Sequence, residues 1–296
     1  MIPFSASLRR LALSLALLLG APATLAAQAD PYILSNTEVI AIPASKLGRD
    51  YEVYVSLPAA YKPQGKRYAV LYVPDANYGF PVVRAIADRI NRHGVGLEDF
   101  ILVGLSYAKG DNPADSRRRD YTPTKGQRGS QPVPGQAGES AAYLQYLKTE
   151  VFPLIEKRYA ADPARRLFIG HSYGGLLGLQ ALFTEPTLFS HYILGSASLW
   201  FDNRYFFAAE QQYANAHKRL PAKVRMYIGS YETPGKGPRY NKDTDMVGDQ
   251  RDFVRQIQSH RYQGLDLQAT VLQDEDHATL FPAMLSRGLM WALSKP

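Results

Sequence analysis

The chain has 296 residues, with 34 Lys and Arg against 27 Asp and Glu, and it contains no cysteine. The lack of cysteine excludes disulfides, thiolate metal sites and a cysteine nucleophile. The positive charge excess is modest and scattered, and no nucleic-acid-reading motif is present, so nucleic acid is not an expected partner. An anionic small-molecule ligand is compatible with this balance.

Residues 1–29 have the pattern of a signal peptide. Two arginines precede the apolar run Leu11–Leu19, and Ala27-Gln28-Ala29 forms an A-x-A cleavage site. The apolar run is shorter than the ~20 residues that a membrane-spanning helix needs. We expect cleavage before Asp30, or after Ala27, and export to a periplasm. The alternative is an uncleaved leader that anchors the protein in the inner membrane, facing the periplasm.

Residues 30–296 are long enough for a single large domain, and we expect no stable membrane span in them. Short apolar runs predict buried strands, and longer amphipathic segments predict helices. The expected strands are Tyr51–Leu57, Tyr68–Val73, Phe100–Leu105, Arg166–Ile169, Tyr192–Leu194, Val224–Ile228 and Leu267–Leu272. The expected helices are Pro81–Arg92, Gly138–Tyr159, Gly175–Phe183, Asp249–His260 and Ala283–Leu293. This alternation predicts an α/β fold with a mostly parallel central sheet and helices on both faces.

One long segment, Ala108–Gly138, has no periodicity and is rich in Gly, Pro, Arg, Asp and Gln. A loop of this length is usually functional or disordered. Because it follows a central strand, we expect it to face a substrate.

A G-x-S-x-G pattern, Gly170-His171-Ser172-Tyr173-Gly174, lies between an expected strand and an expected helix. In that context the pattern predicts a nucleophilic serine on a tight strand-to-helix turn. The glycines avoid clashes with neighbouring backbone, and the helix N-terminus offers N–H groups to a developing negative charge. The alternative is a glycine-rich turn in which Ser172 is incidental.

A serine nucleophile needs a base on a later loop. His277 follows the last expected strand, which is where the base lies in a chain ordered serine, acid, histidine. His171 adjoins the serine on the sharp turn, so its side chain is expected to point away from the attack site. The other reading of His277 is an exposed loop histidine.

The acid that orients the histidine should follow the strand Val224–Ile228. Glu232 is the first candidate, and Asp243 and Asp245 in the same loop are alternatives. A Ser-His dyad without an acid is also open. For the oxyanion, the backbone N–H of Tyr173 is one donor, and that of Asn77, or failing that Ala76, is the second.

Several segments together resemble the esterase family of α/β-hydrolases that includes antigen 85-type mycolyltransferases, S-formylglutathione hydrolase and feruloyl esterases. Within that family the chain looks most similar to esterases that open the trilactone of enterobactin and salmochelins. The resemblance covers nearly all of the expected mature chain. The segments that carry it are Leu71–Asp75, Arg118–Pro123, Gly170–Gly175, Ser196–Trp200, Asp276–Thr279 and Ser286–Leu289.

The resemblance implies an α/β-hydrolase fold and a serine esterase with Ser172 as nucleophile and His277 as base. It also implies that Arg118 or Arg119 meets the catecholate groups of a siderophore. A ferric tricatecholate is an anion with flat aromatic rims, which arginines and aromatic rings such as Tyr78 and Trp200 can bind.

Neither a cofactor nor a catalytic metal is expected, since any iron would belong to the substrate. The alternatives are another ester substrate, such as a feruloyl or short acyl ester, acyl transfer to an alcohol, and a non-catalytic siderophore-binding protein.

Overall fold

The computed structural model describes residues 30–43, 45–93, 96–128, 131–132 and 135–295. The chain separates into two units, Met1–Ser35 and Asn36–Pro296, and the fold below is that of the second. The expected signal peptide lies outside the described residues.

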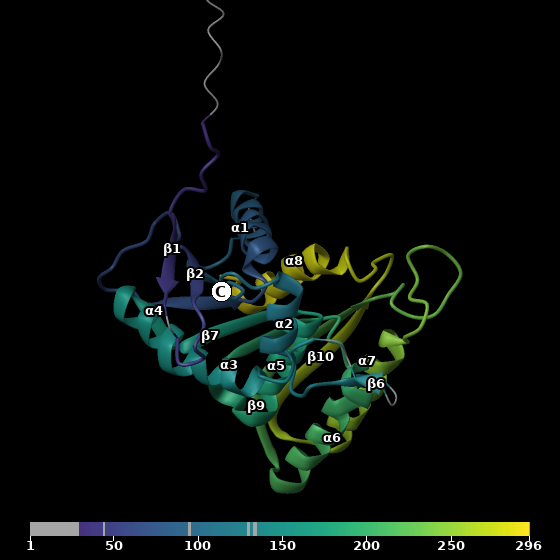
Figure 1. The fold of residues 1–296 in the computed structure, drawn as a ribbon. Helices are drawn as coiled ribbons and strands as arrows, with labels where there is room; N and C mark the ends of the chain where they lie inside the picture. Colours follow the sequence, from purple (N-terminus) through teal and green to yellow (C-terminus); the bar gives the residue numbers. More distant parts are fainter. Residues whose placement is uncertain (1–29, 44, 94–95, 129–130, 133–134, 296) are drawn as a thin grey trace, which may run out of the picture. The chain divides into compact units, whose positions relative to one another are not determined.

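An eight-stranded sheet forms the centre of the unit Asn36–Pro296, with strand order β1-β2-β4-β3-β7-β8-β9-β10 (Figure 1). The first three strands in this order pair antiparallel, and all later neighbours pair parallel. The strands are β1 (Thr37–Ile42), β2 (Tyr51–Ser56), β3 (Tyr68–Val73), β4 (Phe100–Leu105), β7 (Ala161–His171), β8 (His191–Gly195), β9 (Arg219–Gly229) and β10 (Gln263–Leu272). A separate small hairpin pairs β5 (Gln127–Arg128) with β6 (Gln131–Pro132).

The central strands are buried on both faces, as their unbroken apolar runs predict. All six residues of β3 are buried, and so are the last five residues of β7, which lead to the serine. Phe168, Ile169 and Leu71 are fully enclosed there. This rigid centre fixes the positions of the loops that follow each strand.

Helices cover both faces of the sheet (Figure 1). Helices α1 and α8 pack against each other over β4, β8 and β9, while α5 packs on β7 and β8 together with α2, α3 and α6. The helices are α1 (Ala76–Arg92), α2 (Pro113–Tyr121), α3 (Ser140–Tyr146), α4 (Phe152–Arg158), α5 (Tyr173–Thr184), α6 (Phe201–Ala216), α7 (Met246–Ser259) and α8 (Leu280–Leu293). A π-helical turn, η1 (Leu147–Val151), joins α3 to α4, and a short 3₁₀ turn, η2 (Pro186–Leu188), follows α5. The expected α/β architecture is therefore confirmed.

The expectation of a structureless segment over Ala108–Gly138 is wrong in part, because it contains helix α2. Asn112 caps this helix by accepting a hydrogen bond from the Ala114 N–H at 2.9 Å, and Pro113 occupies its first turn. The helix has no apolar stripe, since three of its four buried residues, Ser116, Arg119 and Asp120, are polar or charged. Sequence periodicity therefore could not reveal it.

Helix α6 was not expected either, and it begins irregularly. Asp202, Asn203 and Arg204 adopt left-handed backbone angles with φ of 47°, 53° and 67°. The Asp202 carboxylate accepts hydrogen bonds from the Thr124 hydroxyl at 2.6 Å and the Gln127 N–H at 3.0 Å, which ties the start of α6 to the segment after α2.

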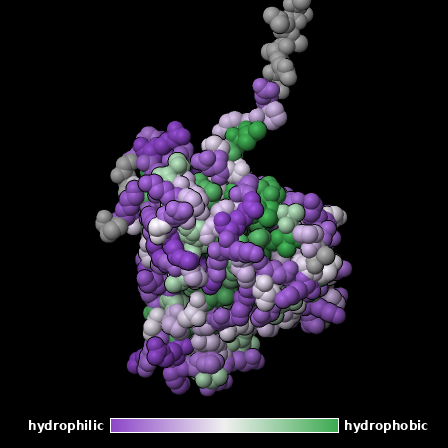
Figure 2. Space-filling view, turned by 90° about the vertical axis from the view of Figure 1, so that its left-hand side faces the viewer, coloured by the Kyte–Doolittle hydropathy of each residue, from purple (hydrophilic) through white to green (hydrophobic). Residues whose placement is uncertain are grey.

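The surface seen in Figure 2 is mostly hydrophilic, with hydrophobic residues gathered in smaller groups.

Candidate active site

Ser172 lies on a strained turn between β7 and α5, with φ of 60° and ψ of −119°. A non-glycine residue with positive φ is uncommon and costs free energy, so it marks a functional candidate. The neighbouring glycines make the turn possible. A Cβ on Gly170 would lie 2.3 Å from the Gly174 carbonyl oxygen, and one on Gly175 would lie 2.9 Å from the Cα of Ala197.

The candidate oxyanion donors lie at two helix N-termini. The Tyr173 N–H is the first of helix α5, where the helix supplies no acceptor. Helix α1 begins at Ala76 after Asp75, whose carbonyl oxygen accepts the N–H groups of Tyr78 and Gly79 at 3.2 and 2.9 Å. The Ala76 and Asn77 N–H groups thus belong to the open first turn of α1.

The side chains of Glu232 and His277 are hydrogen-bonded, with 2.7 Å between Glu232 Oε2 and His277 Nδ1. These residues follow β9 and β10, which are parallel neighbours, so their loops leave the same end of the sheet. Glu232 is fully buried, and its Oε1 also accepts the Ser196 hydroxyl at 2.5 Å and the Gly229 N–H at 2.9 Å. Because an ionised carboxylate only accepts, this contact places a proton on Nδ1 and leaves Nε2 as a base.

The other two acid candidates do different things in the structure. Asp245 caps helix α7, and its Oδ1 accepts the Gly248 N–H at 2.8 Å. Asp243 is exposed and lines the cleft described below. Of the three carboxylates, Glu232 is the one bonded to His277.

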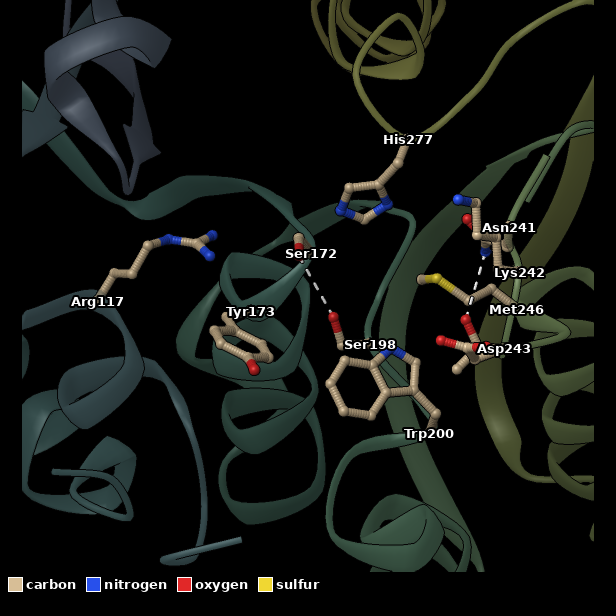
Figure 3. Close-up of a pocket in the computed structure, with 11 residues that line it drawn as sticks. Arg117, Ser172, Tyr173, Ser198, Trp200, Asn241, Lys242, Asp243, Met246 and His277 are labelled. Carbon is tan, nitrogen blue, oxygen red and sulfur yellow. Dashed lines mark hydrogen bonds between the residues drawn. The ribbon is translucent and has the colours of Figure 1, made fainter. Parts of the chain in front are cut away.

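Ser172 and His277 line the same cleft, and Figure 3 shows both side chains directed into it. The Ser172 hydroxyl lies 3.3 Å from the hydroxyl of Ser198, which follows β8. Catalytic contacts are often loose in unliganded enzymes and tighten when substrate binds. In the described residues the Ser172 hydroxyl contacts Ser198, and no hydrogen bond joins it to His277.

The loop that carries His277 is fastened by Arg239. Its Nε donates to Asp276 Oδ2 at 2.6 Å and its Nη2 donates to the Thr279 hydroxyl at 3.1 Å. The hydrogen bond from Arg239, aided by the Thr279 and Ala278 N–H groups, lowers the pKa of Asp276 to about 2. The carboxylate is therefore ionised at neutral pH and holds the loop next to the imidazole.

His171 packs its ring against the ring of His277, with 4.6 Å between centroids. The residue is buried, and burial, with His277 and Arg117 adding to it, lowers the pKa of His171 well below its usual value of 6.5. A neutral imidazole therefore forms part of the wall beside His277. The expected direction of this side chain, away from the site, is wrong to the extent that its ring lines the cleft.

The cleft has two halves that meet at Ser172, His277 and Arg117. One half has a volume of about 520 Å³, and its further lining is mostly polar. The other has a volume of about 600 Å³, and its further lining is mostly aromatic and aliphatic. Both volumes fall in the range of small-molecule sites.

Arg117 is held at this junction by a buried carboxylate. Its Nε and Nη2 donate to the two oxygens of Asp75 at 2.9 and 3.0 Å, and its guanidinium lies 5.2 Å from the centre of the Tyr173 ring. Asp75 has φ of 56° and also accepts the hydroxyl groups of Tyr107 and Tyr78, at 2.6 and 3.2 Å. Figure 3 shows the guanidinium directed toward Ser172.

The expected substrate contacts of Arg118 and Arg119 need correction, because neither lines the cleft halves and Arg117 lines both. Arg119 is buried, with its Nε on Asp120 at 2.8 Å and its Nη1 on Asp111 at 2.5 Å. Arg118 pairs with Asp115. The phase of helix α2 decides which of the three consecutive arginines faces the serine. The two expected aromatic contacts, Tyr78 and Trp200, both line the cleft.

Some lining residues were missed by sequence reasoning. They include Ser198 and, in the segment after β9, Asn241, Lys242, Thr244 and Met246, which line the cleft together with Asp243. The position after a parallel strand was the available signal, since such loops gather at one sheet edge. Among the described residues, no cluster of three or more His, Asp or Glu is arranged to hold a metal ion. Nor does any described helix have the length and hydrophobicity to cross a membrane.

The Esterase family model matches residues 44–277. Ferri-bacillibactin esterase BesA of Bacillus subtilis is 26% identical over 89% of this chain and 92% of its own length. The siderophore enterobactin esterase of Emericella nidulans is also 26% identical, over 84% of this chain and 91% of its own. The crystal structure of the BES protein from Bacillus cereus superposes with a TM-score of 0.76 at 23% identity, covering 90% of this chain and 100% of that one.

The sheet is mostly parallel, and Ser172 lies on the turn after β7, the fifth strand in the sheet order. This is the α/β-hydrolase fold. The chain belongs to the Esterase family. It is a carboxylic ester hydrolase of the serine esterase type.

Proposed function

We propose that this esterase hydrolyses the lactone esters of an anionic catecholate siderophore, with Ser172 as nucleophile, His277 as base and Glu232 as the orienting acid. The observation that carries this proposal is the 2.7 Å contact between His277 Nδ1 and Glu232 Oε2, in a cleft that the serine shares. The three residues follow β7, β9 and β10, at one end of the sheet.

In the proposed reaction His277 Nε2 takes the hydroxyl proton as Ser172 Oγ attacks the ester carbonyl carbon. The carbonyl oxygen becomes an oxyanion, which the N–H groups of Tyr173 and Asn77 stabilise. As the C–O bond breaks, His277 returns the proton to the leaving alkoxide. Water then attacks the acyl-enzyme with the same histidine as base, which releases the acid and restores Ser172.

The proposed substrate is supported by the charge and shape of the cleft. Arg117 lies at the centre, Lys242 lines the polar half, and Trp200 and Tyr78 provide flat rings on either side. Guanidinium groups and aromatic rings suit an anion with planar catecholate arms. Two relatives at 26% identity bear names that describe esterases of siderophores.

The decisive experiment compares wild type with Ser172→Ala on iron-loaded and iron-free catecholate trilactones, with products separated by chromatography. We expect ring opening by the wild type and none above background by the variant. A fluorophosphonate probe should label the wild type at Ser172. A preference for feruloyl or acetyl esters over trilactones would contradict the siderophore as substrate. Acyl transfer to an added alcohol would indicate an acyltransferase. Siderophore binding without labelling or hydrolysis would indicate a binding protein.

We also propose that residues 1–29 direct the protein to the periplasm and are removed there. The Leu11–Leu19 run and the A-x-A site support this. N-terminal sequencing of the protein from a periplasmic extract should begin near Asp30. Recovery of full-length protein with the inner membrane would instead indicate an anchor.

A further inference from the structure

The two halves of the cleft differ in chemistry as well as in position. Beyond the shared residues, the larger half is lined by Tyr78 and Val82 of α1, by Ala278, Phe281 and Pro282 of α8 and its approach, by Tyr107 after β4 and by His171. The smaller half presents hydroxyl, amide and charged groups, among them Ser198, Asn241 and Lys242. A substrate that reaches the serine therefore meets different surroundings on its two sides.

The larger half offers rings rather than hydrogen bonds. The hydroxyl groups of Tyr107 and Tyr78 are both engaged by the Asp75 carboxylate, at 2.6 and 3.2 Å. Phe281 packs edge-on against Tyr78, with 5.5 Å between ring centres, and lies 5.8 Å from the ring of His171. Burial lowers the pKa of His171 well below 6.5, so this ring too is uncharged at neutral pH.

The size of this half matches an aromatic group with its linker. Its volume is about 600 Å³, whereas a cavity of about 150 Å³ already accepts benzene. Tyr78 is 42% exposed, which is unusual for a large apolar side chain in this molecule. An exposed aromatic ring beside a reactive serine is a ready contact for a flat ligand.

We propose that the larger half of the cleft is an aryl-binding subsite, which takes one planar aromatic arm of an ester substrate while the polar half receives the charged remainder. This inference deepens the proposed function and rests on it for the position of the reacting ester at Ser172. Arg117, at the boundary, contacts the anionic edge of the substrate. The rings of Tyr78 and Phe281 hold the face of the arm by stacking and exclusion of water.

Filling the subsite should test this inference. Val82 lines the larger half and no part of the smaller one, so Val82→Trp reduces the space for an arm. Val39→Trp is the matched control, because Val39 is 59% exposed on strand β1. Pro282→Trp blocks the same half from helix α8 and serves as an independent second variant.

The three substrates are ethyl acetate, ethyl benzoate and phenyl acetate, which carry no ring, a ring on the acyl side and a ring on the leaving side. We expect Val82→Trp and Pro282→Trp to lower kcat/KM at least about tenfold for one or both aryl esters. Hydrolysis of ethyl acetate should change less than about twofold, as should all three rates in Val39→Trp. The affected aryl ester identifies which side of the ester bond enters the subsite.

The subsite would be contradicted if both cleft variants hydrolysed all three esters at the wild-type rate. A uniform loss of rate on all three esters in both variants would contradict it as well. Neither result bears on the siderophore proposal, because none of these esters is a lactone. Conversely, if the wild type hydrolyses the aryl esters but no trilactone, the proposal of a siderophore substrate is contradicted and that of the aryl-binding subsite is not. Unimpaired hydrolysis by Ser172→Ala removes the proposed nucleophile.

Discussion

The carboxylate of Asp75 accepts two hydrogen bonds from the Arg117 guanidinium, at 2.9 Å from Nε and 3.0 Å from Nη2. Asp75 immediately precedes helix α1, whose first N–H groups are the candidate oxyanion donors, and Arg117 lines both halves of the cleft. Asp75 thus contacts both elements, because its buried carboxylate holds the arginine and its carbonyl oxygen accepts N–H groups from the first turn of that helix. Bidentate pairs of this kind are rigid as well as strong.

Asp75→Asn should therefore impair activity on charged substrates. Asparagine tolerates the left-handed backbone of this position, so the change removes mainly the charge. We expect kcat/KM to fall about tenfold for an anionic aryl ester and less for a neutral one, because Arg117 is no longer held in place by the carboxylate. A tenfold change corresponds to about 1.4 kcal/mol of free energy. The melting temperature should also fall, since Arg117 loses its partner.

Asp115→Asn is the matched control for Asp75→Asn, because Asp115 pairs with the neighbouring Arg118 outside the cleft. Its activity on both esters should stay near that of the wild type. If the two variants lose activity on the charged ester equally, the arginine that faces the serine has been misassigned.

Glu232→Gln should slow turnover less than His277→Ala. The amide keeps the size of the buried side chain but weakens the contact with Nδ1, and it can leave the imidazole in the wrong tautomer. Replacing the acid of a catalytic triad costs about 10⁴-fold in kcat, while losing the base or nucleophile costs up to about 10⁶-fold. Steady-state rates on a neutral aryl ester measure this order. Glu232→Gln with wild-type kcat would point to a Ser-His dyad.

Ser196→Ala should produce a smaller defect of the same kind. The Ser196 hydroxyl donates to Glu232 Oε1 at 2.5 Å and does not line the cleft. Its loss leaves the carboxylate with one hydrogen bond fewer in a buried place, so we expect kcat to fall by about 3- to 10-fold, equivalent to about 1 kcal/mol. KM should stay constant. A change in KM with constant kcat would assign Ser196 to substrate binding instead.

Folding stability should decline below neutral pH in part because of His191. Burial, reinforced by Lys223, Arg165 and Arg225 against the opposing Asp266, lowers the pKa of His191 to about 4 from an ordinary 6.5. Between these values the unfolded chain binds more protons, so the contribution of the neutral ring is complete above about pH 6.5 and is lost as the pH falls toward 4.

His191→Gln should therefore lose less of its melting temperature than the wild type between pH 7 and pH 5. Thermal unfolding followed by circular dichroism measures the difference. His217→Gln, at an exposed position, is the control and should follow the wild type. Parallel curves for all three proteins would contradict the role of His191.

Arg261→Gly should stabilise the protein. Arg261 follows the last residues of helix α7 and has φ of 49°, a left-handed conformation that glycine adopts without cost. We expect a gain of about 1 kcal/mol, or a rise in melting temperature of about 2–4 °C. Arg255→Gly, at an exposed position inside the same helix, should lower it by a similar amount. A fall for both variants would show that the Arg261 side chain has a stabilising role.

The strands and the sheet were predictable because their apolar runs follow from burial on both faces. The positions of Ser172, Glu232 and His277 could be anticipated because the carboxyl ends of parallel strands share one edge. The arginine could not, because three arginines adjoin and only the phase of an unexpected helix selects Arg117. Likewise, the contact between Ser196 and Glu232 could not be predicted, since the two residues are 36 positions apart in the chain.

Glu232 and His277 are carried by β9 and β10, and β10 is the last strand of the sheet, with a partner on one side only. The base of the esterase therefore follows an edge strand, which is hydrogen-bonded to the sheet on one side only. Mild heating or dilute denaturant that unpairs β10 from the sheet should therefore abolish the esterase activity. The helices and the core should remain folded under these conditions, so the circular dichroism signal should be nearly unchanged.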